Sequence, residues 1–399
     1  MRVTSLSPKP RRGIRASGGP TTQGAPTQSH LERNGLTLSS DVVTTPIRHR
    51  LEELELRLSP FAVQSARSRG REVSEKPSPM RTEFQRDRDR IIHCKAFRRL
   101  KHKTQVFIAP LGDHYVTRLT HTLEVAQISR TIARALNLNE DLTEAIALGH
   151  DMGHTPFGHI GESELDALHP AGFRHSRQSL RIVEQLEKEG EGLNLTWEVR
   201  HGIVSHSKPR GDFLGPDLTE GLSLEGQICR ISDAVAYLNH DLADAFRAKI
   251  VEENSLPDDA VSVIGTTHSQ RIDSMVTDIV ESSWAASGQT VSPRNEQPSI
   301  SMSHAMRDAV NSLREFMFTN VYVPEDQGEE GQAARRIVRL LYRYFNENRN
   351  EIPAEYSLRS RSEDQAVVDY ISGMTDRFAV RVAERIEPGV SEIFRSRLL

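Results

Sequence analysis

A thirteen-residue stretch of the chain, HDMGHTPFGHIGE from His150 to Glu162, contains three histidines, an aspartate and a glutamate. Groups of these types so close together suit a metal site, an acid/base pair, or a polar turn between two helices. His150 and Asp151 follow the apolar run AIALG and precede a methionine and a glycine, so two polar groups end a helix that is predicted to be buried. Because buried polar groups must find partners, this position favours metal binding or catalysis over a simple turn.

Two further metal donors are predicted on neighbouring helices. His121 lies one turn before Val125 on the apolar stripe of one helix, and Asp233 lies midway along another. Each has a structural alternative, since His121 could be an ordinary core histidine and Asp233 could pair with Arg230. Imidazole and carboxylate groups that converge from rigid helices suit a divalent metal, and the sequence does not distinguish Mn, Mg, Fe, Co, Ni or Zn. The candidate metal ligands are His121, His150, Asp151 and Asp233.

The second half of the opening stretch offers acid/base chemistry. His159 and Glu162 lie three residues apart, which is one turn if this segment is helical, so the carboxylate could orient and tune the imidazole. The spacing of His150 and His154 also resembles a zincin helix. That alternative is disfavoured, because the usual glutamate is absent and a glycine and a proline follow.

Other candidates would bind a substrate. Arg118 is a candidate phosphate clamp, because arginine makes bidentate contacts with phosphate oxygens. Asp233, Tyr237 and Asp241 fall on one helix face at four-residue steps. The structural alternative for Tyr237 is a core tyrosine whose hydroxyl is satisfied.

The elements that must position these groups are predicted to be helices, so the fold class is all-α, without internal repeats. The predicted helices contain the stripe Val125, Ile128, Ile132 and Leu136, and the segments 143–150, 178–189, 224–247, 273–282, 305–316, 334–346 and 365–387. Small polar residues, a proline and a glycine predict a soft boundary near 254–270, and a loop is predicted at 285–298.

The composition of the 399 residues, with a net charge of −4, is typical of a soluble globular protein. Residues 1–45 are rich in Ser, Thr, Pro, Gly and Arg and are predicted to be a flexible tail, with a transit peptide as the alternative. Cys94 and Cys229 lack CxxC spacing, which argues against a disulfide framework and fits the cytoplasm. No membrane partner is expected, since no run of about 18 apolar residues is found.

The order His121, His150-Asp151, Asp233 resembles the H…HD…D signature of the HD-domain metallohydrolases. Longer blocks resemble, more closely, the bacterial deoxyguanosine triphosphate triphosphohydrolases and their dNTPase relatives within that family. These blocks are RDRDRIIHCKAFRRLKHKTQVF (86–107), TRLTHTLEVAQISRTIARALNLNEDLTEAIALGHDMGHTPFGHIGE (117–162), QSLR (178–181), LEGQICRISDAVAYLNHDL (224–242) and YISGMTDRFA (370–379). Where the family pattern is GGFEHN, this chain has AGFRHS, with Arg174 in place of an acidic residue and His175 retained. Nucleotide preference could therefore differ.

The resemblance implies an HD-domain helical bundle at about 115–250 with additional C-terminal helices, all within one domain of residues 46–399. It also implies a homo-oligomer that hydrolyses a deoxynucleoside triphosphate, dGTP or another dNTP, to the deoxynucleoside and inorganic tripolyphosphate. The four candidate ligands would hold the metal, His159 and Glu162 would be the acid/base dyad, and His154 would contact the phosphate. The candidate substrate-binding residues are Arg118, Tyr237 under the deoxyribose, Asp241 near the 3′-hydroxyl, Gln105 near the sugar, and His175.

Two other function classes stay open. One is a different HD enzyme, a nucleotide phosphomonoesterase or a cyclic-nucleotide phosphodiesterase, which would share the metal ligands but would not explain Tyr237, His159 and Glu162 together. The other is a non-catalytic protein that binds nucleotides or nucleic acid. The basic segment 86–103 is either a solvated helix face or a site for the triphosphate, for an allosteric nucleotide or, ranked last, for single-stranded nucleic acid.

Overall fold

The structure is a computed structural model that describes residues 46–108, 112, 114–207, 219–290, 297–360 and 362–398. Within these residues the regular elements are helices, with one isolated antiparallel bridge between Thr104 and Thr117. The predicted all-α class is therefore confirmed. The predicted tail, residues 1–45, lies outside the described residues. None of the helices in the described part of the chain is long and apolar enough to cross a membrane.

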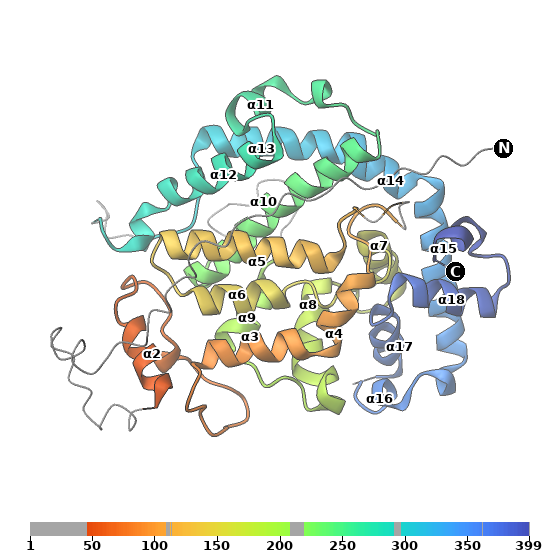
Figure 1. Cartoon of the computed structure of the whole chain (residues 1–399). Helices are drawn as coiled ribbons and strands as arrows, with labels where there is room; N and C mark the ends of the chain where they lie inside the picture. Colours follow the sequence, from red (N-terminus) through yellow and green to blue (C-terminus); the bar gives the residue numbers. More distant parts are fainter. Residues whose placement is uncertain are drawn as a thin grey trace, which may run out of the picture. The chain divides into compact units, whose positions relative to one another are not determined.

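The helices that position the site form a bundle around α5 (Arg118–Ala135), α6 (Glu140–Gly149) and α10 (Leu224–Arg247). Figure 1 shows α5 beside α6, with α10 crossing α5, and contacts between α5, α6 and α10 join all three pairs. Their packing partners are α3 (Glu83–His93), which lies against α6, and α8 (His175–Arg181) and α9 (Trp197–Ser205), which pack on each other. The apolar stripe predicted for α5 is buried, and α10 has the predicted bounds.

Local capping signals set where the helices that carry the site begin. Thr117 accepts a hydrogen bond from the backbone N–H of Thr120, whose side chain accepts one from Thr117 in return, so α5 starts at Arg118. At α6 the side-chain oxygen of Asn139 accepts a hydrogen bond from the backbone N–H of Leu142, without a reciprocal bond. As a result His121 lies in the first turn of α5, and His150 directly follows the last residue of α6.

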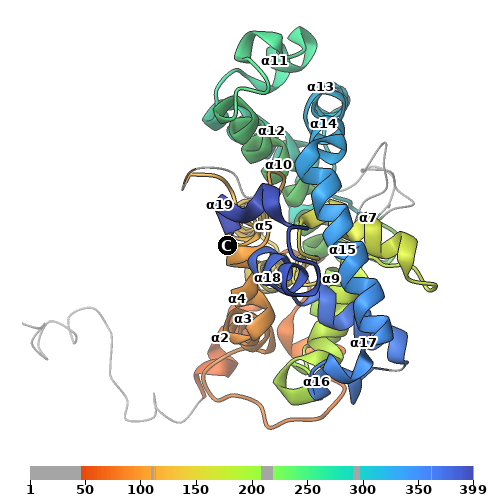
Figure 2. The same cartoon turned by 90° about the vertical axis from the view of Figure 1, so that its right-hand side faces the viewer.

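The remaining helices form two groups on this bundle. One group, at the top of Figure 1, contains α11 (Asp258–Ile264), α12 (His268–Ser282) and α13 (His304–Met317), and α12 and α13 contact α10. The other group, whose helices are seen in Figure 2, encloses a second apolar core: α15 (Glu329–Glu347) packs on α7 (Gly158–Leu168), α17 (Glu363–Ser372) and α18 (Asp376–Ile386). Short helices complete the described chain: α2 (Ile47–Glu55), α4 (Lys95–Arg99), α14 (Val323–Gln327), α16 (Ala354–Ser357) and α19 (Arg395–Leu398).

Five sequence-based element predictions were wrong in detail. Two of them, 273–282 and 334–346, begin five residues late, since α12 starts at His268 and α15 at Glu329. The predicted helix 365–387 is two helices, because Gly373 ends α17 and the side chain of Thr375 caps the start of α18. The predicted helix 178–189 starts earlier, as α8, and widens into a π-helical turn at Ile182–Leu186. The soft boundary at 254–270 contains α11, which packs on α13. Part of the predicted loop 285–298 lies outside the described residues.

One buried carboxylate ties the second core to the segment that carries the site. Asp376, at the start of α18 and 5% exposed, accepts a 2.8 Å hydrogen bond from the Thr104 backbone N–H at Oδ2. Its Oδ1 accepts a 3.0 Å bond from the N–H of Phe157, the residue before α7. Asp376 thus holds both Thr104, next to Gln105, and the start of α7, although it is far from both in the sequence.

Asp376→Ala is expected to lower the free energy of unfolding by roughly 2 to 5 kcal/mol, because two buried backbone N–H groups would lose their acceptor. Urea unfolding followed by circular dichroism measures this loss. The control is Arg377→Ala at the next, exposed position, which should change stability by no more than about 0.5 kcal/mol. Equal losses for the two variants would show that Asp376 does not tie the two parts together.

Candidate metal centre and active site

The candidate site residues surround one cavity of about 1520 Å³. Its lining contains every candidate named from the sequence except His150, whose side chain is fully buried behind it. The candidates that line it are Gln105, Arg118, His121, Asp151, His154, His159, Glu162, His175, Asp233, Tyr237 and Asp241. Helices α5, α7, α8 and α10, the segment before α5 and the turn after α6 therefore bring together groups that are up to 136 positions apart in the sequence, from Gln105 to Asp241.

The four candidate metal ligands lie within reach of a single ion. His121 Nε2 is 3.2 Å from Asp233 Oδ1 and 3.6 Å from Asp151 Oδ2. His150 Nε2 is 3.4 Å from Asp151 Oδ1 and 4.0 Å from Asp233 Oδ1. Two ligands about 2.1 Å from one metal are roughly 3 to 4 Å apart, so these separations fit a common ion.

The hydrogen bonds around these imidazoles also fit a metal. His150 Nδ1 lies 2.6 Å from the Ala147 carbonyl oxygen, which can only accept, so Nδ1 carries the proton and Nε2 carries a lone pair. That buried Nε2 has no hydrogen-bond partner among the described residues. His121 Nδ1 is held in turn by His240, 2.8 Å away, which pairs with Asp241. Such outer contacts fix metal-binding histidines in the orientation that ligation needs.

Protonation states favour ligation as well. Burial lowers the pKa of His121 to about 4, so the imidazole is neutral near pH 7. Burial alone would raise the pKa of Asp151, but His150, His154 and Arg118 hold it well below its usual range, so this carboxylate is ionised. Neutral imidazole and ionised carboxylate are the forms that bind a metal.

Arg118 has a structural role beside the one predicted. Its guanidinium donates 2.7 Å to Asp151 Oδ2, and further N–H groups donate to the carbonyls of Thr104 and Gln105. The side chain is 2% exposed but still borders the cavity. Arg118 therefore positions Asp151, while a contact between Arg118 and a phosphate stays a prediction.

The turn after His150 has no room for a side chain at Gly153. A Cβ there would lie 2.2 Å from the backbone nitrogen of Ser179 in α8. The Ser179 hydroxyl accepts a 2.8 Å bond from the Gly153 N–H and donates 2.7 Å to the His150 carbonyl oxygen. Helix α6 has already ended at Gly149, and His150 to Gly153 form a turn, which excludes the zincin-like helix.

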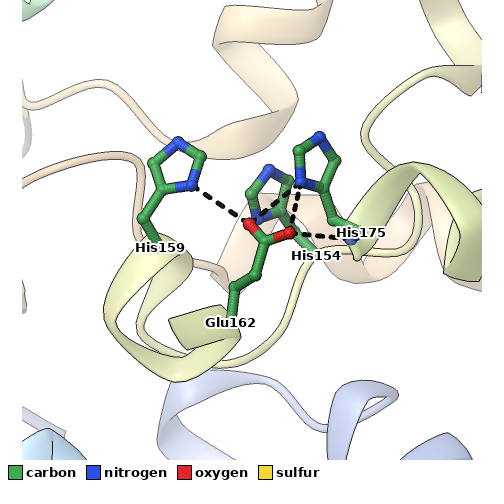
Figure 3. A group of neighbouring side chains, drawn as sticks. All are labelled: His154, His159, Glu162 and His175. Atoms are coloured by element: carbon green, nitrogen blue, oxygen red, sulfur yellow. Dashed lines mark hydrogen bonds and ion pairs between the residues drawn. The ribbon is translucent and has the colours of Figure 1, made fainter. Parts of the chain in front are cut away.

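His159, Glu162 and His175 form a connected acid/base group (Figure 3). His159 Nδ1 lies 3.1 Å from Glu162 Oε2, and His175 Nδ1 lies 2.9 Å from both carboxylate oxygens. Figure 3 shows the two imidazoles on either side of the carboxylate, with His154 behind it. The predicted one-turn spacing of His159 and Glu162 is present in α7. The His159 side chain is 70% exposed, and its ring is therefore open to the cavity.

The Glu162–His175 pair should make stability depend on pH in two directions. Burial alone would raise the pKa of Glu162, but His175 and His159 lower it below its usual value, so Glu162 stabilises the fold above about pH 4.5 and less below it. Burial alone would lower the pKa of His175, but Glu162 raises it above 6.5. His175 therefore stabilises the fold below pH 6.5 and loses this effect as the pH rises through its raised pKa.

Glu162→Gln should accordingly destabilise the metal-free protein most between about pH 4.5 and 6.5, and progressively less as the pH rises above 6.5 through the raised pKa of His175. Urea unfolding of both proteins across this range measures the difference. Glu164→Gln is the matched control on the same helix, because Glu164 pairs with Arg339, which stays charged. If the loss of unfolding free energy in Glu162→Gln stayed constant from about pH 6.5 to 8.5, as it should in the control, the coupling of Glu162 to His175 would be contradicted.

The face of α10 predicted to meet the substrate does line the cavity. The Tyr237 hydroxyl accepts a 2.9 Å bond from Arg314 Nε, and Asp241 Oδ2 accepts one of 2.9 Å from the Tyr322 hydroxyl. Burial raises the pKa of Tyr237 to about 12, so the phenol stays protonated. Gln105 is buried, and its Oε1 lacks a hydrogen-bond partner in the part of the chain that the structure describes.

Several residues around the cavity were missed by sequence reasoning. His206 directly follows α9, and its Nε2 lies 3.8 Å from Oδ1 of the candidate metal ligand Asp151. Arg314, Tyr322 and Arg335 reach the cavity from the C-terminal helices. No short spacing signals any of these residues, since only the folded chain brings them near the motif.

The basic segment 86–103 has a largely structural role. Arg88 pairs with Asp141 at 2.8 Å, and Arg90 donates 2.9 Å to the Leu193 carbonyl and pairs with Glu75. Lys103 is buried, and its Nζ donates to the carbonyls of His154 and Ser372. Among the residues that the structure describes, the arginines and lysines that line the cavity are Arg118, Arg174, Arg314 and Arg335, which lie outside this segment. This arrangement disfavours triphosphate binding by the segment, and its exposed Lys95, Arg98 and Lys101 fit the solvated helix face.

Comparison with known proteins agrees with this geometry. Residues 118–238 match the HD domain family, and residues 300–385 match the phosphohydrolase-associated domain. The chain is 51% identical over 340 residues to a deoxyguanosinetriphosphate triphosphohydrolase-like protein of Caldanaerobacter subterraneus subsp. tengcongensis, covering 84% of this chain and 94% of that protein. Proteins of the same name from Desulfatibacillum aliphaticivorans (50%; 85% and 97% covered) and Clostridium tetani (43%; 85% and 96% covered) are also similar. The chain is thus an HD-domain phosphohydrolase and belongs to the family of deoxyguanosinetriphosphate triphosphohydrolase-like proteins.

Proposed function

We propose that the protein hydrolyses deoxynucleoside 5′-triphosphates to the deoxynucleoside and inorganic tripolyphosphate. The observation that carries this proposal is the shared cavity, where candidate metal ligands, the His159–Glu162 pair and the Tyr237 face of α10 meet. The bond that breaks joins the sugar 5′-oxygen to the α-phosphorus. Water supplies the oxygen that the phosphorus gains, and the 5′-oxygen gains a proton.

The metal ligands and the cations would bind the charged end of the substrate. A divalent ion held by His121, His150, Asp151 and Asp233 would supply Lewis-acid charge neutralisation at the reacting phosphate. Arg314 and Arg335 line the same cavity and could neutralise the rest of the triphosphate. Arg314 donates to the Tyr237 hydroxyl, and Arg335 donates to the Asp326 carboxylate. Both arginines are therefore positioned before substrate arrives.

The acid/base group would handle the protons. His159 has an exposed ring whose Nδ1 is held by Glu162, which leaves Nε2 to protonate the 5′-oxygen or to take a proton from water. Burial lowers the pKa of His154 well below its usual value, so this neutral imidazole can contact a phosphate as a hydrogen-bond partner. His175 supports Glu162 from the opposite side and is proposed to meet the phosphates.

The sugar would lie against α10. Tyr237 is held by Arg314, so its ring has a fixed position at which a ribose 2′-hydroxyl could be excluded. Asp241 and Gln105 supply an acceptor and an amide for sugar hydroxyls, and the unpartnered Gln105 Oε1 suits a ligand contact. Arg174, where the family pattern has an acidic residue, lines the cavity and pairs with Asp166, and is a candidate determinant of base preference.

Product analysis tests the proposal. The purified protein with Mn²⁺ or Mg²⁺ and each of the four dNTPs should release a deoxynucleoside and tripolyphosphate, measured by chromatography and phosphorus NMR. Release of a deoxynucleoside monophosphate would instead show pyrophosphohydrolysis, and turnover of only monophosphates or cyclic nucleotides would identify a different HD enzyme. Each assay is repeated with a second dNTP added, because activation by another nucleotide is also predicted, and light scattering measures the predicted homo-oligomer.

A further inference from the structure

One buried ammonium group joins the turn that follows α6 to the corner between α17 and α18. Lys103 is 3% exposed, and its Nζ donates a hydrogen bond to the carbonyl oxygen of His154 in that turn. The same Nζ donates a 2.7 Å bond to the carbonyl oxygen of Ser372, the last residue of α17. The Lys103 carbonyl oxygen in turn accepts a 3.2 Å bond from the N–H of Arg118 at the start of α5. Lys103 therefore connects three parts of the chain that are distant in the sequence.

The position is unfavourable for a lysine that had only to fill space. Burial lowers the pKa of Lys103 to about 7, and the positive charge of Arg99 lowers it further. In the described part of the chain, both acceptors of Nζ are neutral backbone carbonyls rather than carboxylates. An apolar side chain would avoid the cost of burying this charge, so the two hydrogen bonds indicate the role of the residue.

Asp376 completes this contact from the start of α18. Its carboxylate accepts a 3.0 Å hydrogen bond from the N–H of Phe157. Lys103 thus holds the carbonyl of the first residue of the turn, His154, while Asp376 holds the N–H of the last one. The corner between α17 and α18 therefore fixes both ends of the turn 154–157.

The turn needs this support, because Phe157 has an unusual backbone conformation. Its φ is 61° and its ψ is 24°, which is the left-handed region that large side chains rarely adopt. The Phe157 ring is 1% exposed and stacks on Phe394, with ring centroids 5.9 Å apart. Such a conformation persists only where the surrounding contacts fix it, and it is concentrated at functional sites. Because α7 starts at the next residue, Gly158, the turn sets the direction from which α7 presents His159 and Glu162.

We propose that Lys103 is a positioning residue of the active site, whose hydrogen bonds to His154 and Ser372 fix the turn between the metal ligands and α7. The ring of His154 then lies 5.0 Å from that of His159, between ring centroids, and both border the cavity with Glu162. Neither acceptor of Nζ is a candidate metal ligand, so loss of Lys103 should misplace the acid/base group and leave the ion bound. The catalytic part of this inference rests on the proposed function, whereas the position of the turn can be measured without it.

Lys103→Met in the full-length chain tests the inference first without substrate. Hydrogen–deuterium exchange followed by mass spectrometry should show faster exchange in peptides that cover residues 152–160, because the turn has lost one of its two anchors. Peptides from α5 and α10 should exchange as in the wild-type chain, and the bound Mn²⁺ should stay at the wild-type level. Lys103→Leu is measured beside it, so that the result does not depend on the folding of one variant.

Turnover of a deoxynucleoside triphosphate is measured next. In Lys103→Met, kcat should fall by roughly 10- to 100-fold while KM changes by less than about threefold, because misplacing a catalytic group by about 1 Å can cost about 100-fold in rate. The same substitution in the His159→Ala protein should lower turnover much less, since both changes affect one acid/base group. Lys101→Met is the matched control, because Lys101 is exposed on the short helix Leu100–His102, and it should keep wild-type exchange, metal and turnover.

Wild-type exchange of the 152–160 peptides in both Lys103 variants would overturn the inference, and so would faster exchange throughout the chain, which would show a general loss of stability. An equal loss of turnover in the wild-type and His159→Ala backgrounds would also overturn it. A wild-type chain that turns over no deoxynucleoside triphosphate would overturn the proposed function, and the exchange measurement would still decide whether Lys103 holds the turn.

Discussion

Asp151→Asn is expected to abolish metal binding and to lower the turnover of deoxynucleoside triphosphates by about 10³-fold or more. Asp151 is the residue on which the centre converges, since Arg118 and the Nε2 atoms of His150 and His154 all contact its carboxylate. Asparagine keeps the shape but removes the charge that an ion needs. Several kcal/mol of charge stabilisation at the phosphate would be lost with the ion, and about 1.4 kcal/mol corresponds to a tenfold change in rate.

Metal content by mass spectrometry and steady-state turnover check this result. Asp89→Asn is the control, because Asp89 also pairs with an arginine, Arg81, but lies outside the cavity lining. It should keep both metal and activity. An Asp151→Asn protein that retained metal with wild-type affinity would show that Asp151 is not a ligand.

His159→Ala is expected to keep bound metal while lowering turnover by roughly 10² to 10⁴-fold, the usual contribution of a general acid or base. The ring is 70% exposed and contacts Glu162, His154 and His175 rather than the candidate metal ligands, so its removal leaves those ligands in place. Metal content and turnover on one sample measure both effects.

The double variant His159→Ala/Glu162→Gln sharpens this test. If the two residues act as one unit, the second substitution should add little to the first, because effects within a catalytic unit are not additive. His154, His159, Glu162 and His175 also lie close enough to hold an ion themselves. Loss of metal in His159→Ala would therefore show that these four residues bind an ion, and it would contradict the acid/base role of His159 and Glu162.

Strong apolar periodicity made α5, α6 and α10 predictable, whereas α3 and α9 were not predicted. The α10 segment keeps a helical apolar period over 24 residues, and both of its ends were predicted. The pattern failed where helices meet end to end, as at Gly373, since α17 and α18 share a similar apolar period across the break. Only the cap at Thr375 marks the change of direction, and such a local signal is weak beside a long apolar stripe.

In the site, too, residues close together in the sequence could be predicted, and residues brought in by tertiary contacts could not. His150 to Glu162 could be divided into metal and acid/base groups from spacing alone, because a turn and one helix place them. His206 and Arg314 could not be found in this way. Their places depend on how α9 packs beside α8 and how α13 packs on α10, which are tertiary contacts that no short spacing encodes.

The Arg118–Asp151 ion pair also bears on the order of assembly. The buried carboxylate already has a counter-charge within the chain, so the bundle needs no ion to offset the cost of burying Asp151. Folding and metal loading would then be separate events, unlike those of small domains that fold only around their metal. The finished fold could take up whichever suitable ion is available and exchange it later without unfolding.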